Sequence, residues 1–186
     1  MRSVAEPADG ATAPPAGVGV TAVEADERFA RLTEQFGAAI SRTARSYATS
    51  VAEREDLEQD IAVALWRALP AFRGDCAERT FVLRIAHNQA LSLLARRRRS
   101  AMAQLEDDVA AGLPDPELLA GLSERMRRVF QAIHALPFGQ RQVLVLALEG
   151  LGHQEIGQVL GISANNVAVR VSRARSDLKK TLGEEP

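Results

Sequence analysis

The chain of 186 residues contains little of what redox or metal chemistry needs. Its one cysteine, Cys76, excludes an intramolecular disulfide and a cysteine-based zinc cluster. The three histidines, at positions 87, 134 and 153, are scattered and show no metal-ligand spacing. The sequence also lacks the compact acid–base or metal-binding cluster that an enzyme would need. We therefore expect no catalytic residue, no metal and no cofactor.

Long apolar runs are also missing. No uninterrupted apolar segment approaches the roughly 20 residues that span a bilayer, and no apolar core follows Arg2 as it would in a signal peptide. Aromatic residues make up only 4% of the chain, which favours helices packed by Leu, Val and Ala. No segment alternates polar and apolar residues with the period of a strand. The sequence predicts an all-α, cytoplasmic protein without membrane insertion.

The net charge of −1 conceals an uneven distribution of charge. Residues 79–105 contain six arginines and no acid, and residues 161–182 contain five basic residues against one acid. Between these stretches, residues 100–124 contain six acids and no lysine or arginine. Two basic segments separated by an acidic connector are typical of a protein that binds nucleic acid at two places.

Residues 153–182 have the pattern of a helix-turn-helix. Gly161 suits the left-handed residue that ends a helix, and Ser163 suits the N-cap of the next one. One apolar stripe of that second helix recurs at helical spacing: Val167, Val171, Ala174, Leu178 and Leu182. The opposite face can reach base edges: Asn165, Asn166, Val169, Ser172, Arg173 and Ser176. The alternative for this segment is an ordinary helical hairpin with a solvated basic face.

Apolar periodicity and the positions of proline and glycine divide the chain into two helical domains. The predicted segments are a disordered tail (1–22), a first domain (23–100), a flexible acidic linker (101–123) and a second domain (124–183). Within the first domain, helices are expected at about 23–49, 53–69 and 80–99. Within the second domain, helices at 124–135 and 138–149 precede the helix-turn-helix.

Two blocks of the sequence resemble the sigma-70 family of bacterial RNA polymerase sigma factors. Residues 54–67 (REDLEQDIAVALWR) and 72–88 (FRGDCAERTFVLRIAHN), followed by the arginine run 96–99, resemble region 2. Residues 136–182 resemble region 4. Nothing fills the large third region of housekeeping factors, a layout similar to the extracytoplasmic-function (ECF) group. The resemblance implies an alternative sigma factor, a non-catalytic subunit that directs core polymerase to promoters and promotes DNA opening.

The resemblance also implies three sets of contact residues. The helix at 53–69 would dock on the clamp helices of the largest polymerase subunit through Asp56, Leu57, Gln59, Asp60, Trp66 and Arg67. The melted non-template strand of the minus-ten element would meet Phe72, Arg73, Arg79, Thr80, Phe81, Arg84, Asn88, Arg96, Arg97, Arg98 and Arg99. The duplex minus-thirty-five element would meet Arg141, Asn165, Asn166, Ala168, Val169, Arg170, Ser172 and Arg173. For Phe81, a place in the hydrophobic core is an equal alternative.

Five positions depart from the family pattern. In the loop predicted at residues 72–79, which we call the capture loop, Ala77 stands where a serine or similar residue is usual and Glu78 where an aromatic is usual. Just after this loop, Phe81 stands where tryptophan is usual. A carboxylate at position 78 would repel phosphate, so the shape of the loop and the sequence it reads are open. In the second helix of the helix-turn-helix, Ala168 and Val169 can contact thymine methyl groups but cannot donate hydrogen bonds.

Other functions fit the sequence less well. A helix-turn-helix regulator that binds duplex DNA without polymerase would not need the clamp-docking block. A nuclease or deaminase would need the missing catalytic cluster, and a helical scaffold would not need the basic segments. Two domains on a tether, each with an exposed binding face, further predict an anti-sigma factor that wedges between them.

Overall fold

The computed structural model describes residues 22–103 and 113–183, in which every regular element is helical. This confirms the predicted all-α fold class. The elements are α1 (Ala22–Arg45), α2 (Val51–Ala68), η1 (Leu69–Ala71), α3 (Glu78–Ala103), η2 (Pro116–Leu119), α4 (Glu124–Ala135), α5 (Phe138–Leu148), α6 (His153–Leu160) and α7 (Ala164–Leu182). Except for Ala22, the predicted disordered tail lies outside the described residues.

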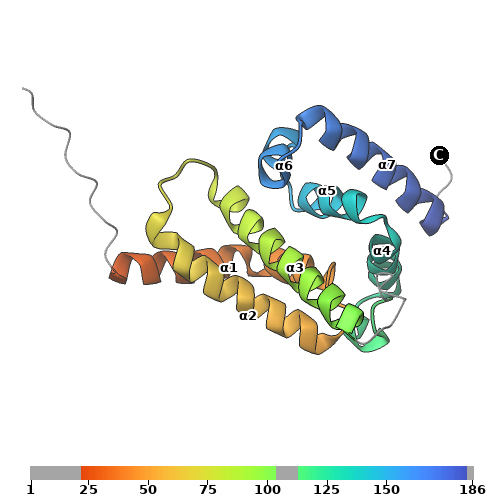
Figure 1. Cartoon of the computed structure of the whole chain (residues 1–186), viewed down its shortest axis with the longest axis horizontal. Helices are drawn as coiled ribbons and strands as arrows, with labels where there is room; N and C mark the ends of the chain where they lie inside the picture. The colour runs from red at the N-terminus through yellow and green to blue at the C-terminus, as the bar shows by residue number, and fades with distance from the viewer. Residues whose placement is uncertain (1–21, 104–112, 184–186) are drawn as a thin grey trace, which may run out of the picture.

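Helices α1, α2 and α3 form the N-terminal bundle (Figure 1). Ser50 caps α2 by accepting a hydrogen bond from the Glu53 N–H, and the Glu53 carboxylate accepts one from the Thr49 N–H in return. Helix α2 then buries one face through Leu57, Ile61 and Leu65. It ends where Pro70 enters the 3-10 turn η1. The capping residues and the apolar spacing together set the length and the orientation of α2.

Helices α4 to α7 form the C-terminal bundle, in which α5 packs against α6 and α7 (Figure 1). Helix α5 is apolar on most sides because its residues Val143, Leu144, Val145 and Leu146 are all buried. A helix that is apolar all round belongs at the centre of a bundle. Helix α5 is therefore the central helix against which the two helices of the helix-turn-helix, α6 and α7, pack.

Ordered structure reaches into both ends of the segment predicted as a linker, residues 101–123. Helix α3 continues to Ala103, and η2 buries Leu118 and Leu119. The Asp115 N–H donates to the Thr49 carbonyl oxygen at 2.8 Å, which attaches this segment beside the start of α2. The remaining residues of the predicted linker, 104–112, lie outside the described residues.

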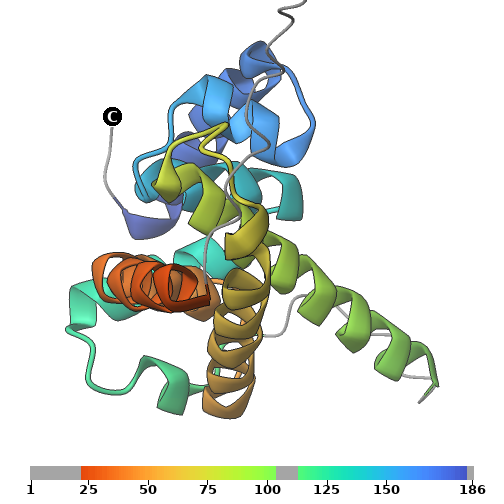
Figure 2. The same cartoon turned by 90° about the vertical axis from the view of Figure 1, so that its left-hand side faces the viewer.

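The two bundles pack against each other, and we refer to this packing as the closed arrangement. Leu83 of α3 is fully buried in one hydrophobic cluster with Val143, Ile156 and Val167 of the C-terminal bundle. Figure 2 shows the carboxy-terminal turns of α3 extending beyond the other helices. None of the helices in the described residues is long and apolar enough to cross a membrane.

Candidate nucleic-acid interface

The turn of the helix-turn-helix has the geometry that the sequence predicts. Gly161 is left-handed with φ 68°, and the Ser163 hydroxyl accepts a hydrogen bond from the Asn166 N–H at 3.2 Å. Gly157 lets the two helices approach closely, since a Cβ there would lie 2.6 Å from the Ile162 carbonyl oxygen. These contacts fix the direction in which α7 leaves the turn.

Helix α7 divides into a buried and an exposed face along the predicted lines. Val167, Val171 and Ala174 are buried against the bundle. The opposite face is exposed over its whole predicted set: Asn165, Asn166, Val169, Ser172, Arg173 and Ser176. An exposed helix face with amide, hydroxyl and guanidinium groups matches the donor and acceptor pattern of the major groove.

Three predicted duplex contacts are less accessible than these. Ala168 and Arg170 are half-buried, and Arg170 Nε donates to Asn166 Oδ1 at 2.8 Å. Arg141 is only 3% exposed and donates to the carbonyl oxygens of His134 and Leu136. Burial lowers the pKa of its guanidinium. In the closed arrangement Arg141 therefore cannot reach a phosphate.

Helix α3 presents a basic track. Most of its predicted DNA contacts are exposed: Arg79, Arg84, Asn88, Arg96, Arg98 and Arg99. Two arginines of the track pair with acids of α2, Arg96 with Asp60 at 2.8 Å and the half-buried Arg97 with Glu53 at 2.5 Å. Partly solvated ion pairs of this kind contribute little to the stability of the fold.

The two aromatic residues that flank the capture loop, Phe72 and Phe81, face inward. Phe72 and Phe81 are buried and stack with ring centroids 4.1 Å apart, and the Arg28 guanidinium lies 4.7 Å from the Phe72 centroid. This arrangement supports the alternative in which Phe81 belongs to the core. Thr80 is also buried, with its hydroxyl bonded to Glu155, whereas Arg73 is exposed. The two rings therefore pack in the hydrophobic core at the base of the capture loop.

Glu78, the acid expected to repel phosphate, is neutralised by two arginines of α1 that sequence analysis did not single out. Arg28 Nη2 and Arg31 Nη2 donate to Glu78 Oε1 at 2.9 and 2.7 Å. The hydrogen bond from Arg31 is the largest cause that lowers the pKa of Glu78, to about 2. Because the partners lie 47 and 50 residues away, no local pattern could reveal this pairing.

The predicted polymerase-docking residues of α2 separate by exposure. Leu57 is fully buried, so it packs the bundle and cannot contact a partner while α2 stays in place. Asp56, Gln59 and Arg67 are exposed, and Asp60 is half-buried. Trp66 is 52% exposed, with Nε1 donating to Asp26 Oδ1 at 3.0 Å, and it lines a hollow of about 340 Å³ beside Arg67 and Pro70.

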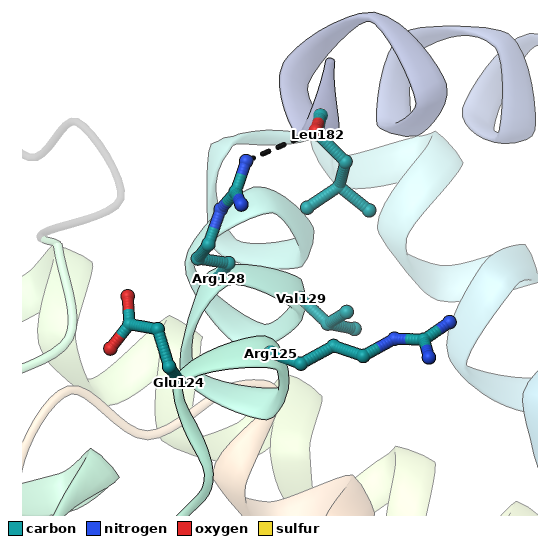
Figure 3. A pocket seen from close by; sticks show the side chains of 5 residues that line it. All are labelled: Glu124, Arg125, Arg128, Val129 and Leu182. Carbon is teal, nitrogen blue, oxygen red and sulfur yellow. Dashed lines mark hydrogen bonds between the residues drawn. The ribbon is translucent and has the colours of Figure 1, made fainter. Parts of the chain in front are cut away.

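A second hollow, of about 460 Å³, lies between α4 and the carboxy-terminal end of α7 (Figure 3). Val129 and Leu182 line it with apolar side chains, and Arg128 donates to the Leu182 carbonyl oxygen at 3.0 Å. Glu124 is the one acid of its lining, so no pair of carboxylates meets there. Within residues 22–103 and 113–183, no three His, Cys, Asp or Glu side chains gather to hold a metal ion.

A basic helix in one bundle and an exposed recognition helix in the other define a two-domain DNA-binding protein. Comparisons with known proteins identify the family within this class to which the chain belongs. Family models described as "Sigma-70 region 2" and "Sigma-70, region 4" match residues 32–100 and 126–178. The chain is 30% identical to the RNA polymerase sigma factor NccH of Alcaligenes xylosoxydans, over 83% of this chain and 86% of NccH. It is 34% identical to the ECF sigma-E factor of Escherichia coli over 64% and 69% of the two chains.

Solved structures agree with these matches. The structure of CnrH in complex with the cytosolic domain of CnrY matches with a TM-score of 0.63 and 30% identity, over 89% of this chain and 96% of CnrH. The Bartonella quintana sigma factor RpoE, solved with the anti-sigma factor NepR, shares the fold with a TM-score of 0.73 and 21% identity, over 86% and 99% of the chains. The chain belongs to the sigma-70 family, in its ECF group, and is a sigma factor of RNA polymerase. Sigma factors are non-catalytic specificity subunits, so the prediction of a non-enzymatic protein is confirmed.

Proposed function

We propose that this sigma factor makes three separable contacts, one with core polymerase and two with promoter DNA. The observation that carries the proposal is the pair of exposed polar helix faces, on α3 and on α7, each backed by a buried apolar face. Because the two faces lie in different bundles, they suit a promoter with two separate elements. The chain would act in the cytoplasm, where bacterial RNA polymerase transcribes.

The core-polymerase contact uses the exposed side of α2. Asp56, Gln59, Trp66 and Arg67 offer charge, amide and indole groups to the clamp helices of the largest subunit, with Asp60 at the edge. A partly exposed tryptophan beside a hollow has the character of an interface anchor. Leu57 contributes by holding α2 in the bundle.

The minus-ten contact follows the outer side of α3. The arginines at 73, 79, 84 and 96–99 would neutralise phosphates of the melted non-template strand, and Asn88 would hydrogen-bond a base edge. The stacked Phe72 and Phe81 hold the loop that presents Arg73. Thr80 would join this surface only once the C-terminal bundle moves away, because its side chain is buried and bonded to Glu155.

The minus-thirty-five contact uses the exposed face of α7 in the major groove. Asn165, Asn166, Ser172 and Arg173 would read base edges, while Ala168 and Val169 would meet thymine methyl groups. Arg170 and Arg141 would contact the backbone once they are accessible. The apolar pair at 168–169 predicts a minus-thirty-five sequence that differs from the one read by relatives with polar residues there.

Reconstituted transcription with purified core polymerase separates these contacts. Trp66→Ala should weaken core binding, whereas Leu113→Ala, an exposed apolar residue outside the proposed contact faces, should not. Asn88→Ala should retain core binding and lose promoter opening. Loss of core binding in neither the Trp66 nor the Leu113 variant, or in both to the same degree, would contradict the assignment of this face.

We also propose an anti-sigma factor as a partner. The structures of CnrH and RpoE that resemble this chain were solved with CnrY and NepR bound. A mostly apolar groove of about 240 Å³ between α1 and the α4–α5 pair offers a surface for an apolar helix face, with Met126 and Leu148 exposed. A co-expressed candidate should block transcription by the native chain and lose this effect against Leu148→Glu. Equal inhibition of both proteins would exclude the groove.

A further inference from the structure

A hollow of about 270 Å³ lies where the carboxy-terminal half of α3 meets the junction of α4 and α5. We call it the seam hollow, because both bundles contribute to it. Its lining contains two kinds of side chain, apolar and cationic. The apolar walls include Leu94, Leu136 and Phe138, and the cationic groups are the guanidiniums of Arg97, Arg98 and Arg141.

These guanidinium groups give the seam hollow an excess of positive charge. Arg97 pairs with Glu53 at 2.5 Å, which neutralises one of the three charges. Arg98 is exposed and forms no ion pair within the described residues. No acid is among the residues that line the hollow. Two positive charges therefore face it without a carboxylate.

Arg141 is the buried member of this set, with only 3% of the residue exposed. Its Nη2 donates to the main-chain carbonyl oxygens of His134 and Leu136, and its buried Nε has no hydrogen-bond partner. Burial and the positive charge of Arg97 both lower its pKa. A buried charge without a counter-charge costs free energy, and an anion bound beside it would recover part of that cost. Arg141 thus suits an anion that enters the hollow from solvent.

The apolar walls indicate that this anion carries an apolar body. Phe138, the first residue of α5, remains 37% exposed beside the arginines. No side chain caps this end of α5, so the positive end of the helix dipole adds to the field of the guanidiniums. An aromatic side chain packs well on a flat ring, while guanidinium groups hold a charged group at the ring's edge.

We infer that the seam hollow binds a small phosphate monoester with an aromatic body, whose phosphate is held by Arg98 and Arg141 and whose ring packs on Phe138. Arginine matches both carboxylate and phosphate, and charge decides between them. A phosphate monoester carries about −1.5 to −2 at pH 7, which balances two unpaired arginines better than a single carboxylate does. The inference does not rest on the proposed function, although these arginines are also proposed DNA contacts, because it concerns the chain without DNA.

Calorimetric titration of the full-length chain with three probes separates the two parts of the site. Phenyl phosphate carries both the charge and the ring, inorganic phosphate lacks the ring, and benzoate lacks the second charge. We expect phenyl phosphate to bind at least about threefold more tightly than either of the other two. It should also raise the midpoint of thermal unfolding, because the ligand binds only the folded chain.

Substitutions test the two halves of the site separately. Arg98→Ala should weaken both phosphates at least about threefold, whereas Phe138→Ala should weaken phenyl phosphate and leave inorganic phosphate unchanged. Arg175→Ala and Leu113→Ala are the matched controls, since both residues are exposed and neither lines the hollow. Thermal unfolding without ligand shows whether each variant folds.

Three results would overturn the inference. One is the absence of both heat and thermal shift with millimolar phenyl phosphate. Another is a loss in Arg175→Ala as large as that in Arg98→Ala, which would leave only diffuse attraction of anions to a basic surface. The third is equal affinity for phenyl phosphate and inorganic phosphate in the native chain. Failure of the proposed function is distinguishable, because it would appear in transcription with core polymerase and would leave these titrations unchanged.

Discussion

Single charged side chains decide the shape of the capture loop. Glu78 would place an acid next to DNA if it pointed outward, but Arg28 and Arg31 hold its carboxylate against α1. The same Arg28 lies over Phe72, so one guanidinium joins the ion pair to the aromatic stack. A residue that departs from the family pattern thus anchors the loop to α1 instead of repelling the DNA.

Glu78→Gln should loosen this anchor. The carboxylate is partly solvated, so we expect a loss of unfolding free energy on the order of 1 kcal/mol at neutral pH. The folded pKa of about 2 lies below the unfolded value of 4.5, so this stabilisation is present above pH 4.5 and is lost as the pH falls toward 2. Urea denaturation at pH 7 and pH 3 measures it. If Glu78→Gln lowered the unfolding free energy by the same amount at pH 3 as at pH 7, an ionic role for Glu78 would be contradicted.

Arg173→Ala tests the recognition face of α7. A guanidinium that contacts a guanine edge contributes about 1–3 kcal/mol of discrimination, so minus-thirty-five binding should fall about 5-fold or more. Arg125→Ala removes the same charge from an exposed position on α4 and should have a much smaller effect. Fluorescence anisotropy of a minus-thirty-five duplex with the assembled holoenzyme gives both values. Equal losses in the two variants would indicate general electrostatics only.

At the scale of elements, the helix-turn-helix depends on the close approach of α6 to the turn that follows it. Gly157→Ala places a Cβ 2.6 Å from a main-chain oxygen, which cannot move as a side chain would. We expect a loss of about 1–3 kcal/mol from overpacking, together with weaker duplex binding. Gly37→Ala in α1 is the matched control, because nothing lies within 4 Å and the helix should gain about 0.5–1 kcal/mol. Thermal unfolding of both variants compares them directly.

The elements themselves were largely predictable from local sequence. Ser163, Gly161 and the stripe at Val167 and Val171 are local signals, and the structure confirms the predicted turn and the buried face. The limits of helices were less certain: α1 ends at Arg45 and α3 begins at Glu78, a few residues from the expected bounds. Capping and tertiary contacts set these ends, and periodicity alone does not report them.

At the scale of the whole molecule, sequence patterns could not foresee how the bundles dock. Leu83 lies off the inner stripe of its own bundle and is buried only because the C-terminal bundle covers it. Thr80 and Arg141 carry polar groups typical of the surface, yet both are buried, and the Thr80 hydroxyl is bonded to Glu155 of the other bundle. Burial of a side chain by a distant segment depends on three-dimensional packing, which no spacing along the chain encodes.

Two histidines at this docking make the closed arrangement sensitive to acid. His134 Nε2 donates to the Arg45 carbonyl, and Gln142 lies 3.3 Å from His87 Nε2. Burial lowers both pKa values from 6.5 to about 4. Between about pH 4 and pH 6.5, these two histidines bind protons in the unfolded chain but not in the folded chain. Stability is therefore full above pH 6.5 and falls as the pH decreases toward 4.

Lowering the pH from 7 to 5 should cost on the order of 2 kcal/mol per buried histidine. Chemical denaturation across this range measures the slope of stability against pH. A His87→Gln, His134→Gln double variant should flatten the slope, whatever its stability at pH 7. His153→Gln, at an exposed position of α6, should leave the slope unchanged. A native slope that persists in the double variant would contradict the assignment.

The central claim is that this chain gives core polymerase its specificity for a two-part promoter. The most direct measurement is run-off transcription with purified core polymerase on a pool of genomic promoters at defined salt, with and without the protein. We predict transcripts that depend on the protein and share two upstream elements, one contacted by α3 and one by α7. No protein-dependent transcripts, together with duplex binding in the absence of core polymerase, would contradict the claim.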